Sequence, residues 1–441
     1  MSAAPSFFIE TYGCQMNAAD AQLMAGVLLR EGFVRAPSAD EAEVVIVNTC
    51  AVRDHAEQRV LGRVGELKRA KRVGDVLGVV GCMAQRLGER LLERAPHVDF
   101  VAGPDAYRQL PQLVGRAREG ERAADTALRA TEHYEDVVPE RGSAASAWIT
   151  VQRGCDYRCT FCIVPMTRGP ERSRRLADVV REAERLAERG VSEVTLLGQT
   201  VNSYHDGDHD FADLLRAVGA VAGIRRLRFT SPHPNDFTDR VVAAMAEVEA
   251  VCEHVHLPAQ SGSSAVLRRM LRRYTREEYL RLVERLRAAI PDLALTTDLI
   301  AGFPGESEAD FAATLSLVDE VGFDDAFTFR YSPRAGTAAT RLGDAVPDDV
   351  AAGRLERLIA AVRRTARARN AGLVGTTHEI LVEQAARRGP SLQGRTRQHR
   401  VAILDGPAEW IGTYRTVRFT GTTGATFSAV AVEAALHGGE R

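Results

Sequence analysis

The sequence predicts an α/β protein made of three successive parts. In residues 1–116, strand-like runs that end in a cysteine alternate with helical stretches, which predicts a parallel-sheet α/β domain. In residues 147–371, six further strand and helix units predict a partial (βα)6 barrel, because a closed barrel needs eight. After residue 371 the apolar period becomes two, which predicts a small β-barrel over 372–441. The polar residues 117–146 form a linker or strap.

The composition is that of a soluble protein. Hydrophobic residues make up 45% of the 441 residues and charged residues 26%. We find no signal peptide and no apolar run near the roughly 20 residues of a membrane span, so we expect a cytoplasmic protein. Seven cysteines cannot all pair, and disulfides are rare in that compartment. The cysteines therefore indicate metal binding or catalysis.

The N-terminal part repeats one unit three times. Apolar runs at 7–13, 44–49 and 76–81 lead to Cys14, Cys50 and Cys82, and helix-compatible stretches follow at 18–30, 57–71 and 85–94. Ligands bind outside the carboxyl ends of parallel strands, so the three thiols are expected at one edge of the sheet. Their spacing is far too long for a local zinc knuckle. On the residues alone, three inert core thiols remain an alternative.

The central part predicts strands at 148–152, 193–197, 226–230, 254–257, 293–300 and 326–331, with helices at 175–189, 211–221, 238–246, 276–289 and 308–321. A barrel left open on one side can admit a large substrate laterally. Polar residues lie at or just after the strand ends, on the expected active face: Gln199, Asn202, Ser231, Gln260 and Asp298. Each could bind a ligand or merely cap a loop or helix.

The loop after the first barrel strand holds Cys155, Cys159 and Cys162 in a C-x3-C-x2-C spacing. A zinc site normally recruits four ligands, whereas three thiolates suit a 4Fe-4S cube with one iron left open. A structural zinc loop is the alternative. Cys252 has no thiol neighbours in the sequence, and we expect a structural role for it.

The C-terminal part is basic. Residues 345–441 contain 14 arginines, no lysine and nine acidic residues, and residues 348–370 predict an amphipathic helix with a basic face. Strand-like runs follow at 379–383, 400–404, 414–419 and 427–432. Five arginines concentrate in one loop and strand region: Arg387, Arg388, Arg395, Arg397 and Arg400. This composition predicts phosphate contacts with RNA, although a solvated face is the simpler alternative.

Several motifs resemble known families. The C-x3-C-x2-C loop on the first strand of a barrel resembles the radical S-adenosylmethionine superfamily. Gly13-Cys14-Gln15-Met16-Asn17, Asn48-Thr49-Cys50 and Gly81-Cys82 are similar to the N-terminal domain of methylthiotransferases, and Gly394-Arg395-Thr396-Arg397 resembles the nucleic-acid-binding TRAM domain. Segments 12–17, 198–202, 228–234 and 258–263 are most similar to the members that act on N6-isopentenyl-adenosine in tRNA. Met166 stands where these members usually have Tyr, and Thr200 where they have Asn.

The resemblance implies a transferase that adds a methylthio group to C2 of an isopentenylated adenosine next to the anticodon. It implies two 4Fe-4S clusters and S-adenosylmethionine as cofactors. Cys155, Cys159 and Cys162 would hold the cluster that splits S-adenosylmethionine, and Cys14, Cys50 and Cys82 an auxiliary cluster that supplies sulfur. The implied S-adenosylmethionine contacts are Gln199, Asn202, Ser231, Gln260 and Asp298, with Phe303 and Glu306 in a Gly-rich turn. Arg330 and Tyr331 could face the nucleotide or pack.

The implied partners are a tRNA anticodon stem-loop, a flavodoxin-like or equivalent electron donor and a sulfur donor. We expect a monomer that does not associate with a membrane. Threonylcarbamoyl-adenosine and a ribosomal-protein aspartate are alternative substrates. A non-catalytic iron-sulfur RNA-binding redox sensor and a radical methylase with a single cluster are alternatives of other classes.

Overall fold

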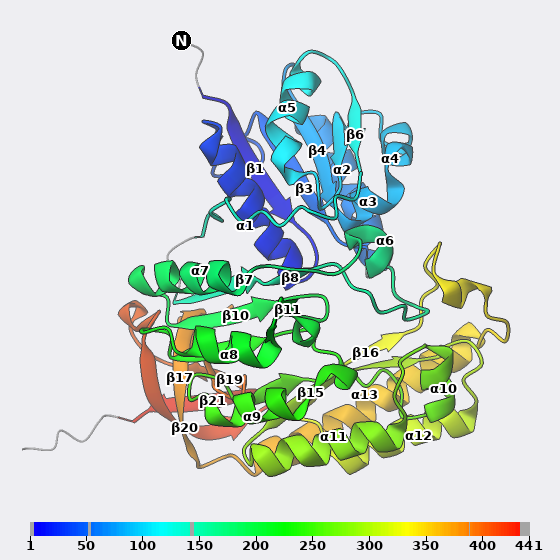
Figure 1. Cartoon of the computed structure of the whole chain (residues 1–441), viewed down its shortest axis with the longest axis vertical. Coiled ribbons are helices and arrows are strands. Elements are labelled where there is room, and N and C mark those ends of the chain that lie inside the picture. The colour runs from blue at the N-terminus through cyan, green and yellow to red at the C-terminus, as the bar shows by residue number, and fades with distance from the viewer. Residues whose placement is uncertain (1–3, 52–53, 142–144, 388, 433–441) are drawn as a thin grey trace, which may run out of the picture.

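The computed structural model describes residues 4–51, 54–141, 145–387 and 389–432 and arranges them in the three predicted parts. In Figure 1 the N-terminal domain is blue to cyan, the central barrel is green to yellow, and the small C-terminal barrel is orange to red. No helix in these ranges is long and apolar enough to cross a membrane. The N-terminal domain and the small barrel lie against different sides of the central barrel (Figure 1).

The N-terminal domain is a six-stranded parallel sheet in the order β2-β1-β3-β4-β5-β6. Its strands are β1 (Ser6–Thr11), β2 (Val34–Arg35), β3 (Val44–Thr49), β4 (Val76–Gly81), β5 (Phe100–Ala102) and β6 (Ala123–Asp125). Its helices are α1 (Gln15–Arg30), α2 (Asp54–Ala70), α3 (Cys82–Leu87), α4 (Glu89–Arg94) and α5 (Leu110–Arg118). Every residue of β3 and β4 is buried, which explains their unbroken apolar runs.

Two expectations for this domain need correction. The helix predicted over 85–94 is two helices, α3 and α4, because Gly88 between them takes a positive φ of 54° that a continuing helix cannot adopt. Part of the expected linker belongs to the sheet, since β6 pairs with β5. Further along it, Tyr134 and Val137 are buried in the core of the domain. The described part of this segment is therefore a strap packed on the first domain.

The partial barrel is confirmed. Parallel strands β7 (Ser146–Thr150), β10 (Glu193–Leu197) and β13 (Arg226–Phe229) form one half, and β14 (His254–His256), β15 (Ala294–Ala301) and β16 (Asp325–Arg330) form the other. Around them lie α7 (Leu176–Glu188), α8 (Phe211–Gly219), α9 (Asp239–Glu247), α10 (Ser264–Arg269), α11 (Arg276–Ala289) and α12 (Glu308–Val321). Capping boxes begin α11 at Thr275 and α12 at Ser307, which explains why their predicted bounds hold.

Short elements surround the cysteine loop of the barrel. They are β8 (Gln152–Arg153), α6 (Val164–Arg168) and β9 (Arg172–Ser173), with the hairpin of β11 (His205–Asp206) and β12 (His209–Asp210) nearby in the sequence. β8 and β9 pair in antiparallel fashion, so the loop that carries the three cysteines is closed at its base.

The predicted basic helix is α13 (Asp348–Ala371), and it packs on the barrel. Its apolar face joins the main core through Leu358, Ala361 and Val362. On its basic face Arg354 binds Glu306 at 2.9 Å, and other arginines bind carboxylates of α12 or its start: Arg357 with Glu308, and Arg364 with Asp319. Much of its positive charge is therefore used within the protein.

The C-terminal part is a closed five-stranded barrel in the order β17-β18-β19-β21-β20. Its strands are β17 (Thr377–Ala385), β18 (Leu392–Thr396), β19 (Val401–Leu404), β20 (Tyr414–Thr422) and β21 (Thr426–Ala431). The apolar alternation predicted four of them, but β18 was not predicted. That strand contains Gly394, where a Cβ would stand 2.5 Å from the Leu381 carbonyl oxygen, so glycine permits the close pairing with β17.

The small barrel docks at the amino ends of the central strands. Arg226, the first residue of β13, donates to the carbonyl of Arg395 at 2.8 Å, and Arg228 donates to that of Arg397 at 2.7 Å. In return, Arg397 binds Glu253 just before β14, and Arg400 binds Asp324 just before β16, each at 2.9 Å. The cysteine loop follows β7 and β8 and therefore lies toward the opposite end of the barrel strands.

Two stacked histidines at this docking surface predict a loss of stability in acid. The His254 and His399 rings lie 4.9 Å apart, and burial lowers the pKa of both, to about 3 for His399. The pKa of a histidine in the unfolded chain is about 6.5. Below that pH the unfolded chain therefore binds protons that the folded chain does not bind. Stability is therefore full above about pH 6.5 and falls as the pH drops toward the folded values.

The measurement is the thermal unfolding midpoint between pH 8 and pH 5. His399→Asn removes one of the two groups, and asparagine tolerates the positive φ of 65° at this position. We expect a shallower decline in this variant than in the parent protein. Equal pH dependence of the two proteins would contradict this role for His399.

Candidate functional site

The loop with Cys155, Cys159 and Cys162 is held by contacts that bring its thiols together. The Cys155 amide donates to the Gly169 carbonyl at 3.2 Å, and the Cys162 amide donates to the Cys159 carbonyl at 3.0 Å. Gly154 has a φ of +77°, and the carbonyl of Pro170 occupies the space that a Cβ would need. The glycine before the first cysteine is therefore required by both geometry and space.

Each of two thiols in this trio contacts a polar side chain. The Thr200 hydroxyl lies 3.1 Å from the Cys155 sulfur, and Arg272 donates to the Cys159 sulfur at 3.4 Å. Burial raises the pKa of Cys155, and burial together with the charge of Cys159 raises that of Cys162 to about 12. Burial therefore disfavours the thiolate form of Cys155 and Cys162, whereas coordination to a metal deprotonates a thiol outright.

The second trio meets at the carboxyl edge of the N-terminal sheet, as predicted. Cys14 precedes α1, Cys50 follows β3, and Cys82 begins α3 after β4. A Cβ at Gly13 would stand 2.8 Å from the Cβ of Cys50. The backbone at Cys14 therefore approaches Cys50 as closely as glycine allows.

Two residue pairs fix the spacing within this second trio. Asn17 donates to the Thr49 carbonyl at 2.9 Å, and Asn48 donates to the Asn17 carbonyl at 2.7 Å, which ties the Cys14 turn to the Cys50 turn. Thr49 donates to the Val80 carbonyl at 2.5 Å, which ties the Cys50 turn to the strand before Cys82. Both asparagines are fully buried, so their hydrogen bonds are shielded from water.

Positive charge acts on the thiols of the second trio. A hydrogen bond from Cys50, assisted by the positive charge of Arg168, lowers the pKa of Cys14 to about 6 despite its desolvation. Burial raises the pKa of Cys82, and the Arg168 guanidinium opposes that rise. The charge of the buried Arg334 also acts on Cys50. Two arginines therefore bring positive charge to three sulfur atoms.

The two trios lie on facing surfaces of their domains. Cys82 packs with Ala51 and with Ile163, the residue after Cys162. Helix α6, which follows the barrel trio, packs on α3, which begins with Cys82, and Figure 1 shows the two helices next to each other. A ligand on one trio would therefore be near a ligand on the other.

Both trios fit iron-sulfur clusters better than single metal ions. Among the described residues, no three or more His, Cys, Asp and Glu side chains are placed to hold one metal ion together. A cube binds one thiolate per iron, so its ligands stand farther apart than the four ligands of a zinc ion. Three cysteines in each trio match a cube with one open iron.

The predicted S-adenosylmethionine residues fall into two groups. The first group lines the strand ends: Gln199 accepts from the Gly154 amide at 2.6 Å, beside the barrel trio. Ser231 is exposed after β13 with a φ of +59°, and Gln260 has a φ of +67°. A positive φ in residues other than glycine is costly and often marks a ligand site. Asp298 lies within β15 rather than after it, and contacts His256 at 3.4 Å.

The second group uses its polar atoms within the protein. The Asn202 amide donates to the His233 carbonyl at 2.9 Å and accepts from the His233 amide at 2.7 Å. Glu306 accepts from the Gly302 amide at 2.8 Å and from Arg354 at 2.9 Å, although its second carboxylate oxygen is buried without a hydrogen bond. Phe303 is fully buried and packs edge-on against Phe161 of the cysteine loop. These three residues support the loops around the site through contacts within the protein. Their contact with the cofactor stays a prediction.

Packing also indicates the roles of the other residues singled out near the carboxyl ends of the barrel strands. The Tyr331 ring packs against Phe303 at 5.3 Å, which gives it a packing role, whereas Arg330 is half exposed and lies 3.9 Å from Asp348. Met166 is 49% exposed on α6, and a Cβ at Gly336 would stand 2.6 Å from its terminal methyl group. Cys252 is buried with a pKa raised by desolvation, in keeping with a structural role.

The arginines predicted to bind RNA have different roles. Arg395 pairs with Glu383, and Arg397 and Arg400 hold the small barrel on the central one through Glu253 and Asp324. Carboxylates therefore already engage the guanidinium groups at these three positions, and RNA contact stays a prediction for them. Arg387 is exposed, and Arg388 lies outside the described residues. RNA contact stays a prediction for these two.

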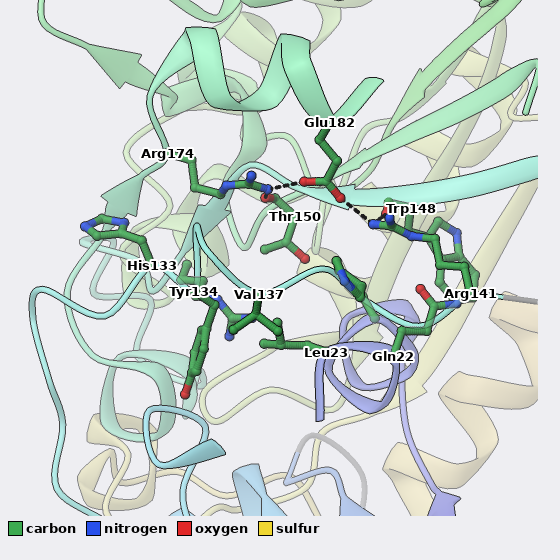
Figure 2. A pocket seen from close by; sticks show the side chains of 13 residues that line it. Gln22, Leu23, His133, Tyr134, Val137, Arg141, Trp148, Thr150, Arg174 and Glu182 are labelled. Atoms are coloured by element: carbon green, nitrogen blue, oxygen red, sulfur yellow. Dashed lines mark hydrogen bonds and ion pairs between the residues drawn. The ribbon is translucent and has the colours of Figure 1, made fainter. Parts of the chain in front are cut away.

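A cavity of about 30 Å³ separates the strap from the first barrel strand (Figure 2). Arg141 and Arg174 both bind Glu182 beside it, and Figure 2 shows this chain of charges along one wall, with Tyr134 and Leu23 on the other side. A space of this size can hold ordered water but is too small for a cofactor such as S-adenosylmethionine. The cavity belongs to the packing between the domains.

Several residues that shape the site were not predicted from the sequence. Asn17, Asn48 and Thr49 stand inside the quoted cysteine motifs but were given no role, and their places beside Cys14 and Cys50 are a usable signal. Arg168 lies six residues after Cys162, but the carboxylate that it binds lies in another domain. Arg272 and Asp20 carry no local signal, since their partners are distant in the sequence.

Two family profiles match the chain. The radical SAM superfamily matches residues 149–318, and the uncharacterized protein family UPF0004 matches residues 6–103. The first match covers the central barrel with its cysteine loop, and the second covers the sheet with the other trio.

Curated relatives match nearly the whole chain. A Porphyromonas gingivalis protein is 46% identical over 97% of this chain and 95% of its own length. An Anaeromyxobacter dehalogenans protein is 48% identical over 96% and 93%, and a Geobacter metallireducens protein is 45% identical over 95% and 97%. All three are named tRNA-2-methylthio-N(6)-dimethylallyladenosine synthase.

Solved structures share the fold at low identity. The radical S-adenosylmethionine methyltransferase TsrM from Kitasatospora setae aligns with a TM-score of 0.56 and 17% identity, covering 74% of this chain and 73% of that one. The cobalamin-dependent S-adenosylmethionine radical enzyme OxsB aligns with a TM-score of 0.52 and 12% identity, covering 82% and 58%. These likenesses support the fold alone.

The contact between Thr200 and Cys155 predicts an effect on the reduction potential of the barrel cluster. A hydrogen bond to a ligand sulfur stabilises the more negative, reduced state. In a Cys14→Ala/Cys50→Ala/Cys82→Ala protein, Thr200→Val should therefore lower the midpoint potential by a few tens of millivolts, because one hydrogen bond contributes about 1 kcal/mol. Thr195→Val, on strand β10 just before the loop that carries Thr200, serves as the control. An unchanged potential in Thr200→Val would exclude the hydrogen bond.

Proposed function

The chain belongs to the radical S-adenosylmethionine methylthiotransferases whose curated members are named tRNA-2-methylthio-N(6)-dimethylallyladenosine synthase, and from this we propose its function. It is a transferase that replaces the C2 hydrogen of an isopentenylated adenosine in tRNA, next to the anticodon, by a methylthio group. The cofactors are two 4Fe-4S clusters and S-adenosylmethionine.

The observation that carries this proposal is the approach of two cysteine trios across one domain boundary. A single radical cluster would need only Cys155, Cys159 and Cys162. The contact of Cys82 with Ile163 brings the second trio to the same place. An aromatic C2–H is neither acidic enough for a protein base nor a leaving group for simple displacement, so a radical source and a sulfur source must reach one carbon atom.

The protein residues bind and position the reacting groups. When bound, the barrel cluster and S-adenosylmethionine supply the radical, and the auxiliary cluster supplies sulfur. Cys155, Cys159 and Cys162 would hold the first cluster, with Thr200 and Arg272 donating to its sulfur ligands. Cys14, Cys50 and Cys82 would hold the second, with the Asn17 and Asn48 pair fixing their spacing. Gln199, Ser231 and Gln260 line the strand ends, where S-adenosylmethionine would bind.

The substrate must span the length of the central barrel if the small barrel also binds it. The small barrel docks at the amino ends of the strands, and the cysteines lie toward the carboxyl ends. A tRNA is long enough for both contacts, and the open side of the partial barrel would admit its anticodon loop. The exposed Arg387 is the described member of the predicted RNA set that remains available for phosphate.

The remaining partners follow from the proposed reaction. Splitting S-adenosylmethionine consumes an electron, so a flavodoxin-like or equivalent donor is required. Repeated turnover consumes sulfur, so a sulfur donor is required. We place the protein in the cytoplasm, where its tRNA substrate is made. We also propose that it is a monomer.

The direct test is anaerobic turnover with reconstituted protein, reductant, S-adenosylmethionine and an isopentenylated anticodon stem-loop RNA. The expected product is the RNA with a methylthio group on the modified adenosine, detected by nucleoside mass analysis. An RNA with threonylcarbamoyl-adenosine should remain unmodified. Turnover of that RNA alone would favour the alternative substrate, and absence of 5′-deoxyadenosine would favour a redox sensor.

The two trios should have separable roles. Cys14→Ala should retain S-adenosylmethionine cleavage but lose methylthiolated product by about 10³-fold or more, because only the sulfur source is damaged. Cys159→Ala should lose the cleavage itself. The control is Cys252→Ala, a buried cysteine away from both trios, which should retain both activities. Equal loss of both activities in Cys14→Ala and Cys159→Ala would refute this division.

A further inference from the structure

Arg168 links the radical loop to the second trio. It is the last residue of α6, six positions after Cys162, yet its side chain enters the N-terminal domain. Only 3% of the residue is exposed. A buried guanidinium needs compensation by negative charge and by hydrogen bonds, so its partners indicate its role.

Arg168 shares its carboxylate with a second arginine. Its Nη2 atom lies 2.7 Å from one oxygen of Asp20, and the Nη2 atom of Arg153 lies 3.1 Å from the other oxygen. The Tyr107 hydroxyl also donates to Asp20, at 3.2 Å. Asp20 is fully buried, so two buried cations depend on one buried anion.

The group therefore carries an excess positive charge. The Nη1 atoms of both arginines are buried without a hydrogen-bond partner among the described residues. Arg153 is partly compensated, because its guanidinium lies 4.8 Å from the centre of the Tyr134 ring. The neighbouring pair differs: Arg172 binds Asp105 through two contacts of 2.9 and 3.0 Å, one cation to one anion. Arg168 thus lacks the compensation that Arg172 has.

The missing anion belongs to the second trio. The charges of Cys14 and Cys82 both act on Arg168, and α6 packs against α3, the helix that begins with Cys82. A 4Fe-4S cube in its resting 2+ state with three thiolates carries about one net negative charge, which matches the excess. We infer that Arg168 is a positioning residue that supplies the buried positive charge for the auxiliary cluster, from the loop that carries the radical cluster. This inference rests on the proposed function, because it presupposes that cluster.

The test measures the auxiliary cluster alone. The full-length Cys155→Ala/Cys159→Ala/Cys162→Ala protein retains only the second trio, and its cluster is titrated by absorption and electron paramagnetic resonance. Removing a nearby positive charge disfavours the reduced state, so Arg168→Met should lower the reduction equilibrium constant by about tenfold, or about 59 mV for one electron. Arg168→Lys retains the charge and should restore most of the potential.

Arg172→Met is the matched control, since it removes an equally buried arginine from the same interface. A role of Arg168 in domain packing alone predicts equal potentials in Arg168→Met and Arg172→Met, and that outcome would overturn the inference. If Arg168→Met does not fold, Asp20→Asn tests the same claim with the opposite sign, because removing the shared anion should raise the potential. An unchanged potential in Asp20→Asn would likewise overturn it.

The outcome also separates this inference from the proposed function. A parent triple variant that binds no iron would overturn the auxiliary cluster and the inference together. If the parent binds a cluster but its reduction potential does not change in Arg168→Met or Asp20→Asn, only the inference is overturned.

Discussion

Buried ion pairs between the N-terminal domain and the barrel hold the site together. Asp20 binds Arg153 and Arg168, and Asp105 binds Arg172, with both carboxylates fully buried. Removing one partner of a buried pair typically costs about 3–5 kcal/mol, because the other charge is left uncompensated. The two domains are therefore fixed in one orientation. Since Cys82 then packs on Ile163, the orientation of the domains sets the distance between the two trios.

The candidate reaction site and the docking surface for the small barrel lie at opposite ends of the central barrel. Its carboxyl ends carry the polar residues and strained backbone expected of a ligand site, including the positive φ at Ser231 and Gln260. Its amino ends hold the small barrel through Arg226, Arg228 and the ion pairs of Arg397 and Arg400. A substrate that contacts both ends must be extended, which suits a tRNA better than a small molecule. Because the domains at both ends are fixed, they would then set the distance between the part of the RNA bound by the small barrel and the modified base.

How much the sequence could predict depends on the distance between interacting residues. One cysteine trio was identifiable from its C-x3-C-x2-C spacing, and the other because each member follows a strand. The barrel strands were identifiable because their apolar runs are local. Positions that depend on distant partners could not be inferred: Arg397 looked like a phosphate ligand, but Glu253 lies 144 residues away in the sequence. Glu306 looked like a cofactor contact and pairs with Arg354 of α13. Strand β18 was missed because Gly394 weakens its pattern, although that glycine permits its pairing.

Proximity of the two clusters is the central claim, and their magnetic interaction tests it most directly. Electron paramagnetic resonance spectra would be recorded anaerobically for the fully reduced protein and for the two variants that lack one trio. We predict that the spectrum of the intact protein differs from the sum of the two single-cluster spectra, because spins that are close to each other couple. A spectrum equal to that sum, with both clusters present and reduced, would contradict the arrangement.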